Sequence, residues 1–104
     1  MHYLITIEYL KPLPEIDVHT SAHREFVDRH LKAGNFILSG PTDPRNGGVI
    51  LAVSSQLSEV ESWVAADPYN VHGLARYKIY PWKIRARSSL LPEGLFPETT
   101  PVES

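Results

Sequence analysis

Residues 2–10, HYLITIEYL, constrain the fold more than any other segment because they are apolar along both faces of a strand. β-Branched and aromatic residues dominate the segment, which is typical of strands. Successive side chains of a strand point to opposite faces. One face therefore carries Tyr3, Ile5, Ile7 and Tyr9, and the other carries His2, Leu4, Thr6 and Glu8. Such a strand fits a sheet that is covered on both faces.

A loop and a helix are predicted after this strand. Residues 11–17 contain two prolines, which favour a loop. Asp17 or Thr20 would cap a helix that runs to about Ala33. Gly34 would end this helix, because glycine readily adopts the left-handed conformation that helix C-termini require.

A β-hairpin is predicted next. Residues 36–39 (FILS) form a short apolar strand, and residues 49–53 (VILAV) return beside it. The segment between them, TDPRNGG at 42–48, is dense in turn-forming residues, as hairpin connections are. Two strands joined in this way run antiparallel.

A second helix and a last strand complete the pattern. Ser58 and Glu61 have the spacing of a capping box at the start of a helix that runs to about Ala66. Asp67–Pro68 would end this helix, because proline disfavours helical geometry in the residue before it. Residues 74–82 (LARYKIYPW) alternate in the manner of a final strand.

The element order βαββαβ predicts a ferredoxin-like α+β fold, in which a four-stranded antiparallel sheet carries two helices on one face. We expect residues 1–84 to form this single domain. The other face of the sheet is left uncovered, although the first strand is apolar there too. We therefore expect a homodimer of the dimeric α+β barrel type, in which a second copy covers that face.

Residues 85–104 are expected to form an extended tail outside this domain. From residue 88 onward the chain contains three prolines and shows no clear periodicity. Disorder is one interpretation of such a segment. The alternative is that the tail packs across a partner or over a pocket mouth through four apolar side chains, Leu90, Leu91, Leu95 and Phe96.

Composition narrows the classes of function. A net charge of −2 does not provide the basic face that nucleic acid requires. The absence of cysteine excludes disulfides, thiol nucleophiles and cysteine-ligated metals. No apolar stretch reaches membrane-spanning length, and the first residues enter a strand pattern directly instead of a signal segment. We therefore expect a soluble, cytoplasmic protein with no nucleic-acid or membrane partner.

Three histidines, His19, His23 and His30, fall within roughly 40° of one another on the first predicted helix. A metal shared by His19 and His23 is disfavoured, because Thr20 replaces the glutamate of the zincin pattern and no ligand set completes a site. For His19 and His30 a structural role is preferred. For His23 we favour general acid/base chemistry, since imidazole titrates near neutral pH and Asp67 would orient its ring.

Other candidates for the same site have structural alternatives. An aspartate before proline, such as Asp67, is a common turn former. Ser39 lies at the end of a predicted strand, where serine is usually only a polar terminus, but its hydroxyl would suit a substrate oxygen. Gly47–Gly48 lacks the P-loop spacing and is interpreted as a hairpin turn.

The order and spacing of these motifs resemble the YciI-like, or YCII-related, family over roughly the first four-fifths of the chain. The matching features are His23 eleven residues before Gly34, then Ser39–Gly40–Pro41, Gly47–Gly48, Asp67–Pro68–Tyr69 and Pro81–Trp82. The resemblance implies a dimeric ferredoxin-like fold with a catalytic histidine and aspartate, by position His23 and Asp67. The family often has arginine where Thr20 stands, so an anion-binding role there would pass to His19 or Arg24.

The family includes a dehydrochlorinase of a chlorinated hydroxyhydroquinone, and its fold resembles that of muconolactone isomerases. The resemblance therefore implies a lyase or isomerase that needs no cofactor or metal and acts on a small cyclic or aromatic substrate. A non-catalytic module that binds a small ligand or dimerises is the alternative. The expected catalytic residues are His23, Asp67 and Ser39, and the expected substrate-binding residues are Tyr69, Pro41 and His19.

Overall fold

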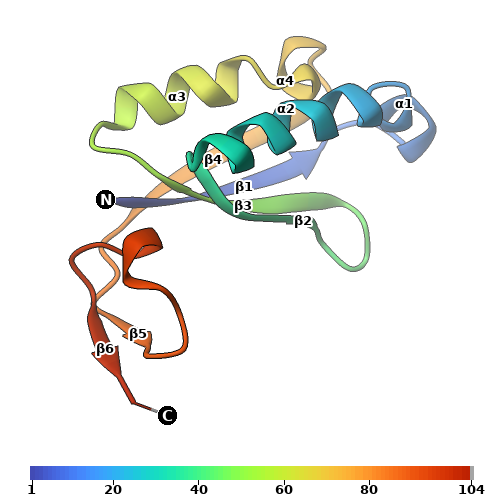
Figure 1. Cartoon of the computed structure of the whole chain (residues 1–104). Helices are drawn as coiled ribbons and strands as arrows, with labels where there is room; N and C mark the ends of the chain where they lie inside the picture. The colour runs from blue at the N-terminus through green and yellow to red at the C-terminus, as the bar shows by residue number, and fades with distance from the viewer. Residues whose placement is uncertain (104) are drawn as a thin grey trace.

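The computed structural model describes residues 1–103, which contain a four-stranded antiparallel sheet with helices packed on one face (Figure 1). The strands are β1 (His2–Tyr9), β2 (Phe36–Pro41), β3 (Gly47–Val53) and β4 (Ala75–Trp82), and they lie in the order β2-β3-β1-β4. The helices are α1 (Leu13–Asp17), α2 (Thr20–Ala33), α3 (Leu57–Ala65) and α4 (Pro68–Val71). This arrangement confirms the predicted ferredoxin-like fold.

β1 is one of the two inner strands of the sheet. It pairs with β3 on one side and β4 on the other, so that Ile5 is aligned with both Ile50 and Ile79. The core lies between the helices α2 and α3 and the face of the sheet on which they pack. Ile5 of the sheet and Val60 of α3 are both completely buried there.

The start of α2 differs from the prediction, whereas its end is confirmed. Gly34 ends the helix with a positive φ of 79°. The N-cap is His19, because residues 13–17 already form the separate helix α1, with a proline in its first turn where the missing N–H is tolerated. The predicted loop at 11–17 is therefore largely helical, and neither Asp17 nor Thr20 is the cap.

The predicted capping box of the second helix is also wrong. α3 begins at Leu57, so Ser58 lies inside its first turn. The local hydrogen bonds are made instead by Ser54, whose Oγ accepts from the Gln56 amide at 3.1 Å and donates to a Glu59 carboxylate oxygen at 2.7 Å. Ser54 is buried at the end of β3, and this environment could not be inferred from the spacing of serine and glutamate alone.

The tail contains short elements: β5 (Ala86–Ser88), the 3-10 turn η1 (Glu93–Leu95) and β6 (Thr100–Val102). β5 and β6 pair in parallel, and the tail lies on the side of the sheet opposite the helices (Figure 1). Phe96 is buried and stacks on the His2 ring with 5.3 Å between ring centroids. The tail thus packs on the first strand of its own chain.

The face of the sheet opposite the helices carries an apolar row that crosses all four strands. The row consists of Leu38, Leu51, Leu4 and Tyr80, which are aligned by the strand register. At its two ends, Leu38 and Tyr80 are 62% and 47% exposed. None of the helices within residues 1–103 is long and apolar enough to cross a membrane.

Candidate active site

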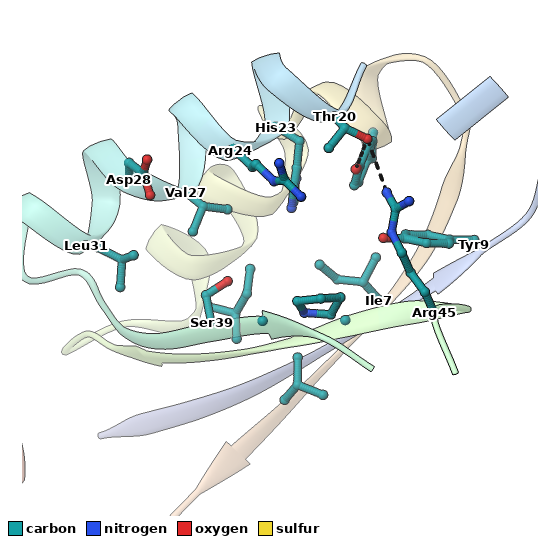
Figure 2. A pocket seen from close by; sticks show the side chains of 16 residues that line it. Ile7, Tyr9, Thr20, His23, Arg24, Val27, Asp28, Leu31, Ser39 and Arg45 are labelled. Carbon is teal, nitrogen blue, oxygen red and sulfur yellow. Dashed lines mark hydrogen bonds between the residues drawn. The ribbon is translucent and has the colours of Figure 1, made fainter. Parts of the chain in front are cut away.

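A cavity of about 280 Å³ lies between α2 and the sheet, next to the β2–β3 hairpin (Figure 2). Aliphatic side chains of α2, β1 and β3 form part of its wall, including Val27, Ile7 and Ile50. The polar side chains that matter most for chemistry come from four elements and the β2–β3 turn: Tyr9, Thr20, His23, Ser39, Arg45 and Tyr69. The cavity is therefore a mostly apolar pocket with a few polar groups, which is typical of small-molecule sites.

His23 and Asp67 meet at this cavity. The distance between His23 Nδ1 and Asp67 Oδ1 is 2.8 Å. Asp67 is 1% exposed, whereas the His23 side chain is 14% exposed and reaches the cavity. His23 lies within α2 and Asp67 is the N-cap of α4. The two residues are 44 positions apart in the sequence, and the packing of α2 against α4 brings them together.

Three donors hold the Asp67 carboxylate in place. Oδ1 accepts from His23 Nδ1 and from the Tyr69 amide at 3.1 Å, and Oδ2 accepts from the Tyr77 hydroxyl at 2.6 Å. The amide bond arises because Asp67 is the N-cap of α4, with Pro68 in the first turn. Burial, and then the charge of Asp67, raise the pKa of Tyr77 well above its usual value, so Tyr77 remains a donor.

The hydrogen bond to Asp67 fixes how His23 can act. A carboxylate that accepts from Nδ1–H selects the tautomer in which Nε2 carries the lone pair. The His23 ring also stacks on Tyr69, with centroids 4.0 Å apart and planes within 13°. Its side chain points from α2 towards the sheet (Figure 2). Nε2 is therefore the nitrogen left to exchange a proton with a molecule in the cavity.

Tyr69 has a second contact that ties the site to the start of α2. Its hydroxyl lies 2.9 Å from Thr20 Oγ1, and the ring packs edge-on to Tyr9. Burial raises the pKa of Tyr69, which keeps the phenol protonated near neutral pH. Tyr69 thus lines the cavity and supports the His23 ring.

The other predicted site residues divide into two groups. Ser39 and Pro41 line the cavity from β2, on the side opposite His23. His19 is not among the lining residues, because its ring stacks on His72 at 3.8 Å instead. His30 is partly buried and packs against Phe36 at the edge of the core, and this burial lowers its pKa. The three histidines therefore have three different environments, and within residues 1–103 no cluster of three or more potential metal ligands occurs.

Sequence reasoning missed Tyr77, Tyr9 and Arg45. Tyr77 was visible only as one residue of an alternating strand, and nothing in that pattern marks it as a partner of Asp67. Arg45 lies in the TDPRNGG turn, whose composition predicts only a hairpin connection. Its position at the cavity depends on the direction in which the hairpin projects, which the sequence does not specify.

The comparisons with known proteins agree with this fold. One solved structure that matches is 5-chloro-2-hydroxyhydroquinone dehydrochlorinase (TftG) from Burkholderia phenoliruptrix AC1100, in complex with 2,5-dihydroxybenzoquinone. The TM-score is 0.69 at 24% sequence identity, over 81% of this chain and 95% of that chain. Among curated proteins, none matches the sequence significantly. The model of the YCII-related domain matches residues 1–83, and the chain therefore belongs to the YCII-related family.

Proposed function

We propose that the protein is a lyase or isomerase that moves a proton on a small cyclic or aromatic substrate without a cofactor. The observation that carries this proposal is the hydrogen-bonded pair of His23 and Asp67 at the wall of a small, mostly apolar cavity. A buried carboxylate behind an imidazole that reaches a cavity is the usual arrangement of a general base and its orienting partner.

In the proposed reaction, His23 Nε2 removes the proton of a ring hydroxyl. The oxyanion electrons then form a carbonyl while a proton returns at a ring carbon, which completes an isomerisation. Where that carbon bears a leaving group, His23 next removes the proton of a second ring hydroxyl, and a second carbonyl forms as the leaving group departs with its electron pair. Asp67 balances the charge of the imidazolium, and Ser39 donates a hydrogen bond to a substrate oxygen. General acid/base help of this kind accelerates a reaction by about a hundred- to ten-thousand-fold.

The similarity to TftG supports the choice of substrate class. That protein is a dehydrochlorinase in complex with an oxygenated six-carbon ring, and it shares the fold of this chain. The cavity of about 280 Å³ suits a single small ring. We therefore propose hydroxylated aromatic rings and quinones as the class to test, with dehydrochlorination of a chlorinated hydroxyhydroquinone as one specific reaction.

The test combines a ligand screen with one variant. Small phenols, quinones and lactones are screened by thermal shift, because a ligand that binds the folded state raises the melting temperature. Compounds that stabilise the protein, and 5-chloro-2-hydroxyhydroquinone, are then assayed for chloride release and for changes in ultraviolet absorbance.

His23→Ala should abolish turnover while the protein stays folded. His72→Ala, an exposed histidine on the neighbouring turn, is the matched control. Full activity of the His23 variant would refute the proposed base.

A non-catalytic ligand-binding or dimerisation module is the second candidate, and one observation favours it. The Asp67 carboxylate joins α4, α2 and β4 through its three hydrogen bonds, so a purely structural role would also explain its burial. In that case the screen would yield ligands but no product. Substitutions at His23 would then change ligand affinity only.

We further propose that the protein is a homodimer. The apolar row across the sheet (Leu38, Leu51, Leu4 and Tyr80), which is exposed at its two ends, would be covered by the same row of a second copy, which removes apolar surface from water. Light scattering on the wild type should give the mass of two chains. Tyr80→Lys should give one chain, whereas Val71→Lys, at an even more exposed apolar position on α4, should leave the dimer intact. A monomeric wild type would refute this proposal.

A further inference from the structure

Arg45 reaches from the β2–β3 turn across one end of the cavity to the start of α2 (Figure 2). Its Nη2 donates to Asp17 Oδ1 at 2.6 Å and lies 3.3 Å from Thr20 Oγ1. The guanidinium carbon lies 5.8 Å from the centroid of the Tyr9 ring, which is within reach of a cation–π contact. Arg45 is therefore held at the cavity from two sides.

The Arg45 guanidinium has N–H groups that make no hydrogen bond within the described residues. It carries five N–H groups, and both of its hydrogen bonds within residues 1–103 are made by Nη2. The Arg45 side chain is 31% exposed and lines the cavity. The hydrogen bond with Asp17 raises the pKa of Arg45 further above its usual value, so the side chain is always charged. Within residues 1–103, the N–H groups of Nη1 and Nε make no hydrogen bond. Each edge of the guanidinium that can donate two parallel hydrogen bonds also includes an N–H of Nη2, so an anion bound in this way would compete with Asp17.

The surroundings of Arg45 favour a negatively charged oxygen. Three hydroxyl-bearing side chains, Tyr9, Thr20 and Tyr69, line the same end of the cavity. The one carboxylate bound to Arg45 in the described part of the chain, that of Asp17, is 50% exposed. Exposed ion pairs of this kind stabilise little, because water screens them. An anion inside the cavity would therefore compete well for the guanidinium.

The spacing of Thr20 and His23 along α2 places His23 near this end of the cavity. Thr20 and His23 lie three positions apart on α2, so their side chains share one face of the helix. Three residues of α-helix rise by about 4.5 Å. A single substituted ring placed beside His23 would thus bring a substituent close to the guanidinium that Thr20 helps to hold. Of the two residues that the sequence offers for an anion, Arg24 lines the cavity and His19 does not.

We propose that Arg45 determines substrate specificity by binding an anionic oxygen group of the substrate, a carboxylate or an ionised ring hydroxyl, while His23 acts on the ring. Asp17 competes with this anion for the guanidinium. The planar fork of arginine suits such groups, because it donates two parallel hydrogen bonds to them. The inference rests on the proposed function only in placing the substrate in this cavity.

The test measures binding without turnover. Benzoate and its neutral isostere benzamide are titrated into the full chain at neutral pH and followed by amide chemical shifts in NMR. The wild type should prefer benzoate. Arg45→Met, which keeps an apolar stem over Tyr9, should weaken benzoate binding by about tenfold or more and leave benzamide unchanged. Asp17→Asn should strengthen benzoate binding by about two- to fivefold, because the competitor has lost its charge.

The opposite signs of these two effects separate anion binding from a structural role of the ion pair. If Arg45 and Asp17 only stabilised the fold, both variants would lower the melting temperature and neither would change the preference for benzoate. Arg45→Lys is the control for misfolding of the Arg45→Met variant. It keeps the positive charge and should therefore retain part of the preference for benzoate. Equal affinity of the wild type for benzoate and benzamide would overturn the inference. So would a preference that is lost in Arg24→Gln but kept in Arg45→Met.

Failure of this inference can be told apart from failure of the proposed function. If benzoate binding depends on Arg45 but no ring compound is turned over, the acid/base reaction is wrong and the anion site stands. If His23 is needed for turnover but Arg45→Met leaves KM unchanged, the reaction stands and the anion site is wrong.

Discussion

Asp67→Asn provides the sharpest test of the proposed dyad, because the structure predicts which properties it keeps. The Tyr69 amide can only donate, so the amide oxygen of the new asparagine must occupy the Oδ1 position. From there it also accepts from His23 Nδ1, which preserves the ring tautomer. The NH₂ group then faces the Tyr77 hydroxyl, which can rotate and accept. All three contacts survive, and only the negative charge is lost.

The magnitudes follow from this geometry. Opposite charges about 4 Å apart attract by about 4 kcal/mol at an effective dielectric constant of about 20. Losing this attraction to the imidazolium should lower kcat by about a hundred- to a thousandfold. Stability should fall by no more than about 2 kcal/mol, because weaker hydrogen bonds are partly offset by the removal of a buried charge. Asp67→Ala, in contrast, leaves three donors without a partner at a site that is 1% exposed, and should cost about 3–6 kcal/mol.

The assay pairs steady-state kinetics on a substrate from the screen with urea unfolding followed by circular dichroism. Asp67→Asn should be folded and nearly inactive, and Asp67→Ala should be clearly destabilised. Wild-type turnover in Asp67→Asn would refute the role of the charge. Equal destabilisation by the two substitutions would refute the argument that asparagine keeps all three contacts.

Three further outcomes follow from single contacts. Tyr77→Phe removes the 2.6 Å hydrogen bond to Asp67 and should lower the free energy of unfolding by about 1–2 kcal/mol, as measured by the urea midpoint. Burial lowers the pKa of His30 in the folded protein, so the unfolded chain binds more protons below about pH 6.5. The urea midpoint should therefore fall as the pH drops through that value, and less so in His30→Gln. Gly47→Ala would drive a methyl group into the backbone of the neighbouring strand and should destabilise by about 1–3 kcal/mol or more, whereas Gly40→Ala meets no atom within 4 Å and should be mild.

Local chemistry made much of the fold predictable. The apolar alternation of residues 2–10, the left-handed glycine at Gly34 and the proline after Asp67 each act over a few neighbouring residues, and the structure has a strand, a helix end and a helix break there. The helix starts were predicted less well. At both α2 and α3 a plausible cap lay a few residues from the real one, because burial of Ser54 and the extra helix α1 decided the choice.

By itself, the sequence determined the order of strands and helices and the two residues that were candidates for the dyad. Periodicity, turn residues and helix breakers act over short stretches of chain, so they can be recognised in the amino-acid sequence alone. Only the tertiary structure decided that His23 and Asp67 touch, that Tyr77 holds the second carboxylate oxygen, that His19 turns away and that Arg45 reaches the cavity. Those contacts join residues 10 to 53 positions apart, and their formation depends on how whole elements pack against one another.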